Sequence, residues 1–91
     1  MNNMNWRKME RITKGVASHR RLEIIDLLEK SPELSVEEIS EKLKINFNNA
    51  SGHISRLAIA GLLMKRHDGP FVRHKLTDRG LRILKFLKML D

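Results

Sequence analysis

The sequence LSVEEISEKL (residues 34–43) is followed, after two residues, by NFNNASGHISRLAIAGLL (residues 46–63). In the first segment, Ser35 precedes Glu38 by three positions, a capping-box pattern that predicts a short helix beginning just after Ser35. In the second segment, Asn46 is a favourable N-cap and predicts a helix over about residues 47–60, which Gly61 ends. Two helices joined by a turn of about three residues predict a helix-turn-helix unit.

Two more helices are expected before this pair. The first, over about residues 4–16, is predicted by side chains that recur at steps of three and four and so share one helical face. These side chains are Trp6, Met9, Ile12, Thr13 and Val16. A second helix is predicted from the N-cap Ser18 to about Glu29, because Pro32 lacks a backbone donor and restricts the residue before it.

After Gly61 the hydrophobic period changes from that of a helix to that of a strand. LMKRH (63–67) and FVRHKL (71–76) flank Asp68-Gly69-Pro70 and predict a hairpin with Gly69 at its tip. Thr77 or Asp78 then caps a last helix over residues 78–90. The expected fold is mainly α with a small β-hairpin: a winged helix-turn-helix of about five helices and a two-stranded wing, forming one domain over residues 1–91.

Length and composition exclude several classes of protein. The chain has 91 residues, no cysteine and 41% hydrophobic residues, which suits one globular domain without disulfides or thiolate metal sites. No apolar run approaches the roughly 18 residues of a membrane span. The N-terminal MNNMNWRKMER lacks the apolar stretch of a signal peptide. We therefore expect a cytoplasmic protein with no membrane contact.

The net charge of +7 is unevenly distributed along the chain. Residues 1–41 carry seven basic and eight acidic side chains, whereas residues 42–91 carry eleven basic and three acidic ones. A basic excess of this size favours a nucleic-acid partner. An acidic membrane, an acidic protein or a merely basic surface are the alternatives.

The helix over 47–60 is expected to have one buried and one polar face. Ala50, Ile54 and Leu57 follow an inward stripe that continues to Gly61. The opposite face carries small or hydrogen-bonding residues and no acid: Asn48, Ser51, Gly52, Ser55 and Arg56. Asparagine pairs with adenine and arginine with guanine, each contributing about 1–3 kcal/mol of base discrimination. A mid-helix glycine costs up to about 1 kcal/mol; close approach to DNA would explain Gly52, and a tolerated substitution is the alternative.

Phosphate contacts are expected from the start of this helix and from the wing. Asn46 and Asn49 lie where exposed backbone N–H groups attract a phosphate. If Val72 and Leu76 face the core, alternation turns Phe71, Arg73 and Lys75 outward. The wing cations predicted to contact DNA are Lys65, Arg66, Arg73 and Lys75, with Arg66 or Arg73 reaching into a minor groove. The alternative is that they protect an exposed edge strand from pairing.

Residues 34–43 and 46–63 resemble the helix-turn-helix of ArsR-type winged-helix repressors, with Ser51, His53 and AGLL (60–63) at matching positions. KGVASHRRLEIIDLL (14–28) is similar to the family's second-helix motif, and Asp68-Gly69, KLT (75–77) and Gly80 resemble its wing and exit. The resemblance covers about residues 14–80. MarR-type and other small winged-helix groups share this architecture.

The resemblance implies a homodimeric, sequence-specific repressor whose recognition helix is residues 47–60. The family's DNA-contacting positions fall on Asn46, Asn48, Asn49, Ser51 and Gly52. Gly52 replaces a commonly basic residue, and Lys44 replaces the usual turn glycine while offering a phosphate contact. His53 matches a frequent family histidine and is expected to be a packing or phosphate-side residue.

Metal sensing is not expected. The paired cysteines of metal-sensing members would fall on Ser35 and Glu37, and residues 79–90 hold no histidine or carboxylate for the alternative site in the last helix. His67 and His74 on the wing lack a carboxylate partner, which makes them weak evidence for zinc. We predict no metal and no cofactor.

The terminal helices, 4–16 and 78–90, carry more apolar surface than a small core needs. In the last helix the apolar side chains cover about 160° of the helical wheel. The residues predicted to form a two-fold dimer interface are Trp6, Met9, Val16, Ile83, Phe86, Leu87 and Leu90. Packing of these helices on each other within one chain is the alternative. A dimer would place two recognition helices roughly 34 Å apart on a palindromic site.

The sequence therefore predicts a double-stranded DNA-binding transcriptional regulator that represses by occupying promoter DNA. An enzyme is not expected, because no Ser/His/Asp set, phosphate-binding glycine loop or carboxylate pair occurs at useful spacing. One alternative is a winged-helix module that binds protein without sequence-specific DNA binding. Recognition of double-stranded RNA by its shape is another.

Overall fold

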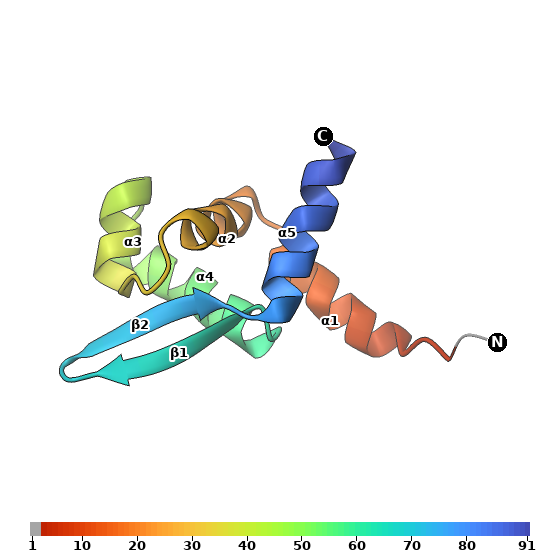
Figure 1. Ribbon diagram of the computed structural model, residues 1–91, viewed down its shortest axis with the longest axis horizontal. Coiled ribbons are helices and arrows are strands. Elements are labelled where there is room, and N and C mark those ends of the chain that lie inside the picture. The colour runs from red at the N-terminus through yellow and green to blue at the C-terminus, as the bar shows by residue number, and fades with distance from the viewer. Residues whose placement is uncertain (1–2) are drawn as a thin grey trace.

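The computed structural model describes residues 3–91 and has the predicted winged helix-turn-helix architecture, with five helices and an antiparallel hairpin (Figure 1). In chain order the elements are α1 (Trp6–Val16), α2 (His19–Lys30), α3 (Val36–Leu43), α4 (Phe47–Ile59), β1 (Leu63–Asp68), β2 (Phe71–Leu76) and α5 (Asp78–Leu90). Helix α1 begins two residues later than predicted, because Asn5 is its N-cap and accepts the Lys8 N–H at 3.1 Å.

Local capping explains where the helices begin. The predicted capping box is present: Ser35 Oγ accepts the Glu38 N–H at 3.1 Å, and Glu38 Oε1 accepts the Ser35 N–H at 2.9 Å. Ser18 caps α2 and Thr77 caps α5 in the same way, each through a backbone N–H three residues on. The N-caps predicted for these helices are confirmed.

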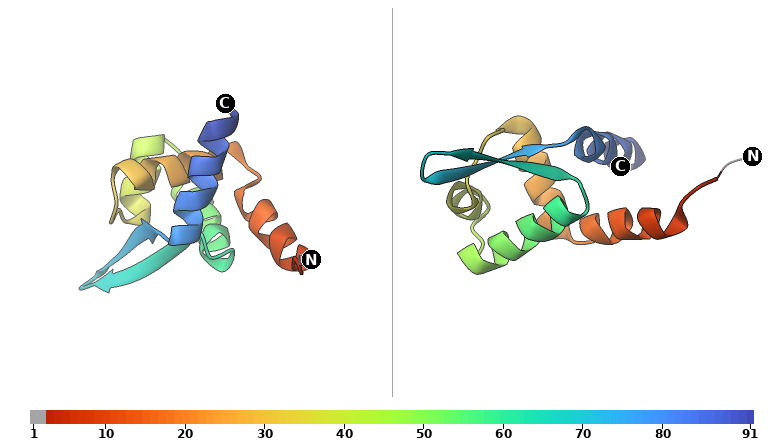
Figure 2. Two further views of the ribbon diagram at one scale, coloured as in Figure 1. Left: turned by 45° about the vertical axis from the view of Figure 1, so that its right-hand side comes forward. Right: turned by 90° about the horizontal axis from the view of Figure 1, so that it is seen from below.

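The core lies around α2, which packs against α3, α4, α5 and the hairpin (Figures 1 and 2). Its central side chains Ile24, Ile25 and Leu28 are at most 1% exposed. They meet apolar side chains from every other layer, among them Ile39, Ile54, Leu57, Leu62 and Leu84. Full burial of such a side chain contributes about 1.5–3 kcal/mol to the free energy of folding. Packing against these α2 side chains therefore holds the surrounding helices in place.

The base of the wing is tied to the connection between α2 and α3. The His74 N–H donates to the Leu34 carbonyl at 2.9 Å, and the Glu33 N–H donates to the His74 carbonyl at 2.9 Å. Leu34 thus forms an isolated antiparallel bridge alongside β2. This third segment has no local signal in the sequence, and its hydrogen bonds hold the wing to the helix-turn-helix.

Helix α1 crosses α4 closely at Gly15. A Cβ at this position would lie 2.5 Å from the Cβ of Ala60, so the crossing requires glycine. Seen from below, α4 and α1 follow one another along the same side of the molecule (Figure 2, right). No helix within residues 3–91 has the length and apolar character needed to cross a membrane.

Candidate nucleic-acid interface

Helix α4 is anchored by one face and exposed on the other. Ala50, Ile54 and Leu57 are fully buried, as the sequence predicts. Of the residues predicted for the polar face, Asn48, Gly52 and Arg56 are exposed, whereas Ser51 and Ser55 are half-buried at its edges. No acidic residue lies on this helix, so its exposed face offers donors and small side chains to a polyanion.

The surroundings of Gly52 are open. A Cβ built there meets nothing within 4 Å in the described part of the chain, so packing within the chain does not require this glycine. Gly52 therefore lets a neighbouring surface approach the α4 backbone closely, at a cost of about 1 kcal/mol relative to alanine.

The N-terminus of α4 is not the open phosphate site that the sequence suggested. Asn46 Oδ1 accepts the backbone N–H groups of Asn48 and Asn49, at 2.7 Å and 3.3 Å. These two donors are therefore already satisfied by the cap. The Asn48 and Asn49 side chains remain exposed.

Lys44 occupies the turn between α3 and α4 in the left-handed conformation, with φ 56° and ψ 46°. A non-glycine residue pays about 1–2 kcal/mol for this backbone conformation. Its side chain is exposed at the side of the helix-turn-helix. Lysine at this position thus costs stability relative to glycine and adds a cation beside the N-terminus of α4.

His53, on α4, is half-buried and lies near the first residues of α2. Burial lowers the pKa of His53, and the nearby charges of Arg21, Arg56 and Arg20 lower it further. Its Nδ1 atom is buried without a hydrogen-bond partner in the described residues. The neutral form of His53 is therefore favoured.

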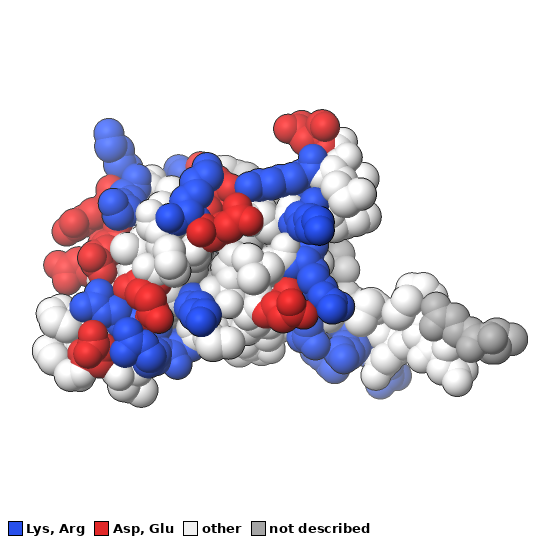
Figure 3. Space-filling view, viewed as in Figure 1, with Lys and Arg blue, Asp and Glu red and all other residues white. Residues whose placement is uncertain are grey.

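The four wing cations do not share one environment. Lys65 and Lys75 are exposed and make no ion pair with the described residues. The register pairs Lys65 with His74 and Lys75 with Met64, so the two lysines lie on opposite faces of the hairpin. Arg66 pairs with Glu33 at 3.4 Å. On the face shown in Figure 3, basic and acidic side chains are interleaved over the wing and α3.

Arg73 is held within the chain. Its Nε atom donates to Asp68 at 3.2 Å, and Nη1 donates to the Glu33 carbonyl at 3.3 Å and to Glu38 at 3.4 Å. The guanidinium also lies 5.2 Å from the centre of the Phe71 ring. The outward alternation of Phe71 and Lys75 is confirmed, but the Arg73 side chain is only 26% exposed and joins the wing to α3.

Glu38 shows the same coupling between α3 and the wing. The pKa of Glu38 is lowered by its hydrogen bonds from the Ser35 backbone and side chain, and the charge of Arg73 lowers it further. The carboxylate thus serves both the capping box and the wing arginine. The sequence pattern identified the first role, but not the second.

The residues predicted for a dimer interface differ in exposure. Trp6, Phe86 and Leu90 are 73%, 55% and 68% exposed, whereas Met9, Val16, Ile83 and Leu87 are half-buried. Helices α1 and α5 border an open groove that includes Met9, Ile12, Ile83 and Phe86. Packing within one chain therefore leaves much of this apolar surface exposed.

The two wing histidines are separated by burial. His67 is exposed near the end of β1, whereas His74 is 1% exposed and its Nδ1 atom lies 2.8 Å from the Leu34 carbonyl. Burial lowers the pKa of His74, although this hydrogen bond partly opposes the shift. Within residues 3–91, no three His, Asp or Glu side chains gather into a possible metal site.

Sequence reasoning missed two features beside α4. Ile59 is 84% exposed and continues the face of Asn48 and Gly52 by helical spacing, a signal that could have been used. Arg11 and Lys14 of α1 lie beside Arg56 and Ile59. Their position depends on the crossing of α1 and α4 and has no local signal.

Comparison with known proteins agrees with this geometry. The family model described as bacterial regulatory protein, arsR family, matches residues 18–65. The transcriptional regulator HlyU from Vibrio vulnificus CMCP6 is 31% identical, with 94% of this chain and 90% of that chain covered and a TM-score of 0.76. HlyU from Vibrio cholerae N16961 is 29% identical, with 98% and 97% covered and a TM-score of 0.83.

A more distant likeness supports the fold. The homodimeric winged helix-turn-helix DNA-binding domain of a possible ArsR-family transcriptional regulator from Mycobacterium bovis is 24% identical, with 99% of this chain and 88% of that chain covered and a TM-score of 0.86. No curated protein matches the sequence significantly. Because the family match spans more than half of the chain and includes α2, α3 and α4, the chain belongs to the ArsR family of bacterial regulatory proteins.

Proposed function

We propose that the chain is a sequence-specific, double-stranded DNA-binding repressor, with α4 in the major groove and the wing on the adjacent backbone or minor groove. The observation that carries this proposal is the acid-free exposed face of α4, opposite a fully buried stripe. Asn48 and Arg56 have the chemistry to read adenine and guanine. Gly52 allows the close approach that base contact needs.

The wing cations support the proposal in two different ways. We assign phosphate contacts, which fix register without reading sequence, to Lys65 and Lys75, because both are exposed and free of ion pairs within the described residues. Arg66 pairs with Glu33, whereas Arg73 pairs with Asp68 and with Glu38 of α3, so Arg73 links the wing to α3. Binding to DNA by Arg73 itself would require exchange of these partners.

The test of function is selection of binding sites from random DNA duplexes with the purified protein, followed by affinity measurements. Arg56→Ala should relax preference at a defined position at a cost of about 1–3 kcal/mol, whereas Lys65→Ala should weaken all duplexes alike. For wild type, the slope of log K against log salt concentration should be about −0.9 for each phosphate that the protein neutralises. A flat salt response would favour a protein partner instead. Tighter binding to double-stranded RNA of matched length would favour recognition of RNA by shape.

We also propose that the repressor is a homodimer on a palindromic operator, joined through α1 and α5. The exposed Trp6, Phe86 and Leu90 support this assembly, as does the homodimeric state of the related Mycobacterium bovis domain. Phe86→Glu should give a monomer by sedimentation, because it places a charge in the apolar interface. Leu81→Glu places the same charge on an exposed apolar residue at the opposite side of α5 and should leave the dimer intact; a dimer with both variants would contradict the interface.

A further inference from the structure

Helix α1 carries a line of cations on the side that faces α4. Arg7, Arg11 and Lys14 follow the spacing i, i+4, i+7, so they share one helical face. This face adjoins Gly15, where α1 crosses Ala60, the C-cap residue of α4. All three side chains are exposed. We name these three residues the α1 stripe.

The α1 stripe lies beside Arg56, the cation of the proposed recognition helix α4. Arg11 and Lys14 border a shallow depression of about 220 Å³, whose α4 side is formed by Arg56, Ile59 and Ala60. Ile59 and Arg56 belong to the exposed face of α4 proposed to enter the groove. A duplex bound along α4 would therefore contact the α1 stripe near the C-terminal end of α4.

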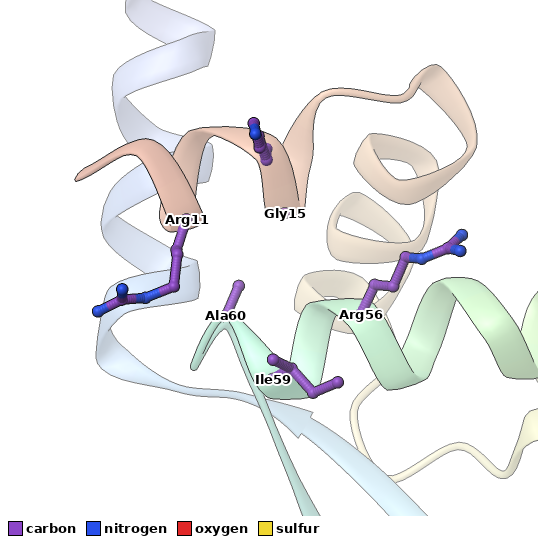
Figure 4. A pocket seen from close by; sticks show the side chains of 6 residues that line it. Arg11, Gly15, Arg56, Ile59 and Ala60 are labelled. Carbon is purple, nitrogen blue, oxygen red and sulfur yellow. The ribbon is translucent and has the colours of Figure 1, made fainter. Parts of the chain in front are cut away.

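The cations are arranged for an extended polyanion rather than for one small anion. Figure 4 shows Arg11 and Arg56 pointing away from one another on opposite sides of the depression. A small carboxylate or phosphate needs donors that converge, whereas successive phosphates of a backbone are met by cations spread along a surface.

Little within the chain neutralises this surface. Lys14 pairs with Glu10 at 3.3 Å, but both side chains are more than 60% exposed, so this pair contributes little. Arg7 and Arg11 form no ion pair within residues 3–91. Their charges are available to a partner.

We propose that the α1 stripe is a second DNA-contacting surface, which binds backbone phosphates beside the groove occupied by α4. The proposal rests on the proposed DNA-binding function and extends it to residues outside the helix-turn-helix and wing. Helix α1 also carries Trp6 and Met9 of the proposed dimer interface. The phosphates it binds would therefore lie between the two half-sites, near the two-fold axis of the complex.

The test compares wild type with Arg7→Ala/Arg11→Ala, using the duplex selected by the wild-type protein. Alanine favours helix, so α1 should be retained, and circular dichroism checks this. Loss of two phosphate contacts per protomer should lower the slope of log K against log salt by about 1.8 per protomer, with base preference unchanged. Arg7→Lys/Arg11→Lys keeps both charges and should restore most of the slope.

The matched control is Lys30→Ala/Lys85→Ala, which removes the same charge from exposed positions on α2 and α5. Its slope should stay near that of wild type. Equal slopes for wild type and the α1 variant, or an equal loss in the control, would overturn the inference while leaving DNA binding intact. A changed base preference in the α1 variant would also overturn it. If wild type binds no duplex at all, the proposed function itself fails.

Discussion

The crossing of α1 and α4 at Gly15 offers a quantitative test of how the interface is built. In Gly15→Ala, the new Cβ would lie 2.5 Å from the Ala60 Cβ, whereas apolar carbon atoms pack at about 3.5–4.0 Å. The helices must therefore separate by about 1 Å or more. Overpacking of this kind costs about 1–3 kcal/mol. The better helix propensity of alanine returns up to about 1 kcal/mol, so with the full return we expect a net loss of up to about 2 kcal/mol.

A double-mutant cycle isolates the steric part of this effect. Ala60→Gly removes the opposing Cβ, so Gly15→Ala/Ala60→Gly should be more stable than the sum of the single changes predicts, by at least about 1 kcal/mol. The assay is urea unfolding followed by circular dichroism, at one fixed protein concentration because dimerisation adds to stability. Additivity within about 0.5 kcal/mol would refute the close crossing. If the α1 stripe binds phosphates as proposed, the single variant should also show a smaller salt slope in DNA binding, because a displaced α1 would carry Arg11 away from the DNA backbone.

Two further predictions concern buried and strained residues. Because the pKa of His74 is lowered in the folded chain, the unfolded state binds more protons, so stability should fall as pH drops below about 6.5. His74→Asn keeps a donor for the Leu34 carbonyl but does not titrate. Its free energy of unfolding, measured with urea, should therefore fall less than that of wild type as the pH drops. Equal pH dependence of the two proteins would show that His74 does not titrate in this range. Lys44→Gly should raise the free energy of unfolding by about 1 kcal/mol, because glycine tolerates φ 56°, and should weaken binding to all duplexes if Lys44 contacts a phosphate. A Tm at or below that of wild type would contradict the strain at Lys44.

The elements of the fold follow from short-range features of the sequence. Caps such as Ser35 with Glu38 join residues three positions apart, and the buried stripe of α4 repeats every three to four residues. Such patterns involve only residues close together in the sequence, so the helices, the hairpin and the polar face of α4 could be predicted without the tertiary structure. The start of α1 shifted by two residues because Asn5, not an earlier residue, caps it.

The environment of each cation depends on segments that are distant in the sequence. Arg73 meets Glu38 across 35 residues and the Glu33 carbonyl across 40, so its spacing on the strand could not reveal that it holds the wing to α3. Charge counts over residues 1–41 also concealed the basic face of α1, because the acids that balance it lie mainly on α2 and α3. Local hydrogen bonds and periodicity thus define the helices and strands, whereas the packing of α1 against α4 and of the wing against α3 selects which charges face a partner. That selection requires long-range burial and ion pairing, which no single segment encodes.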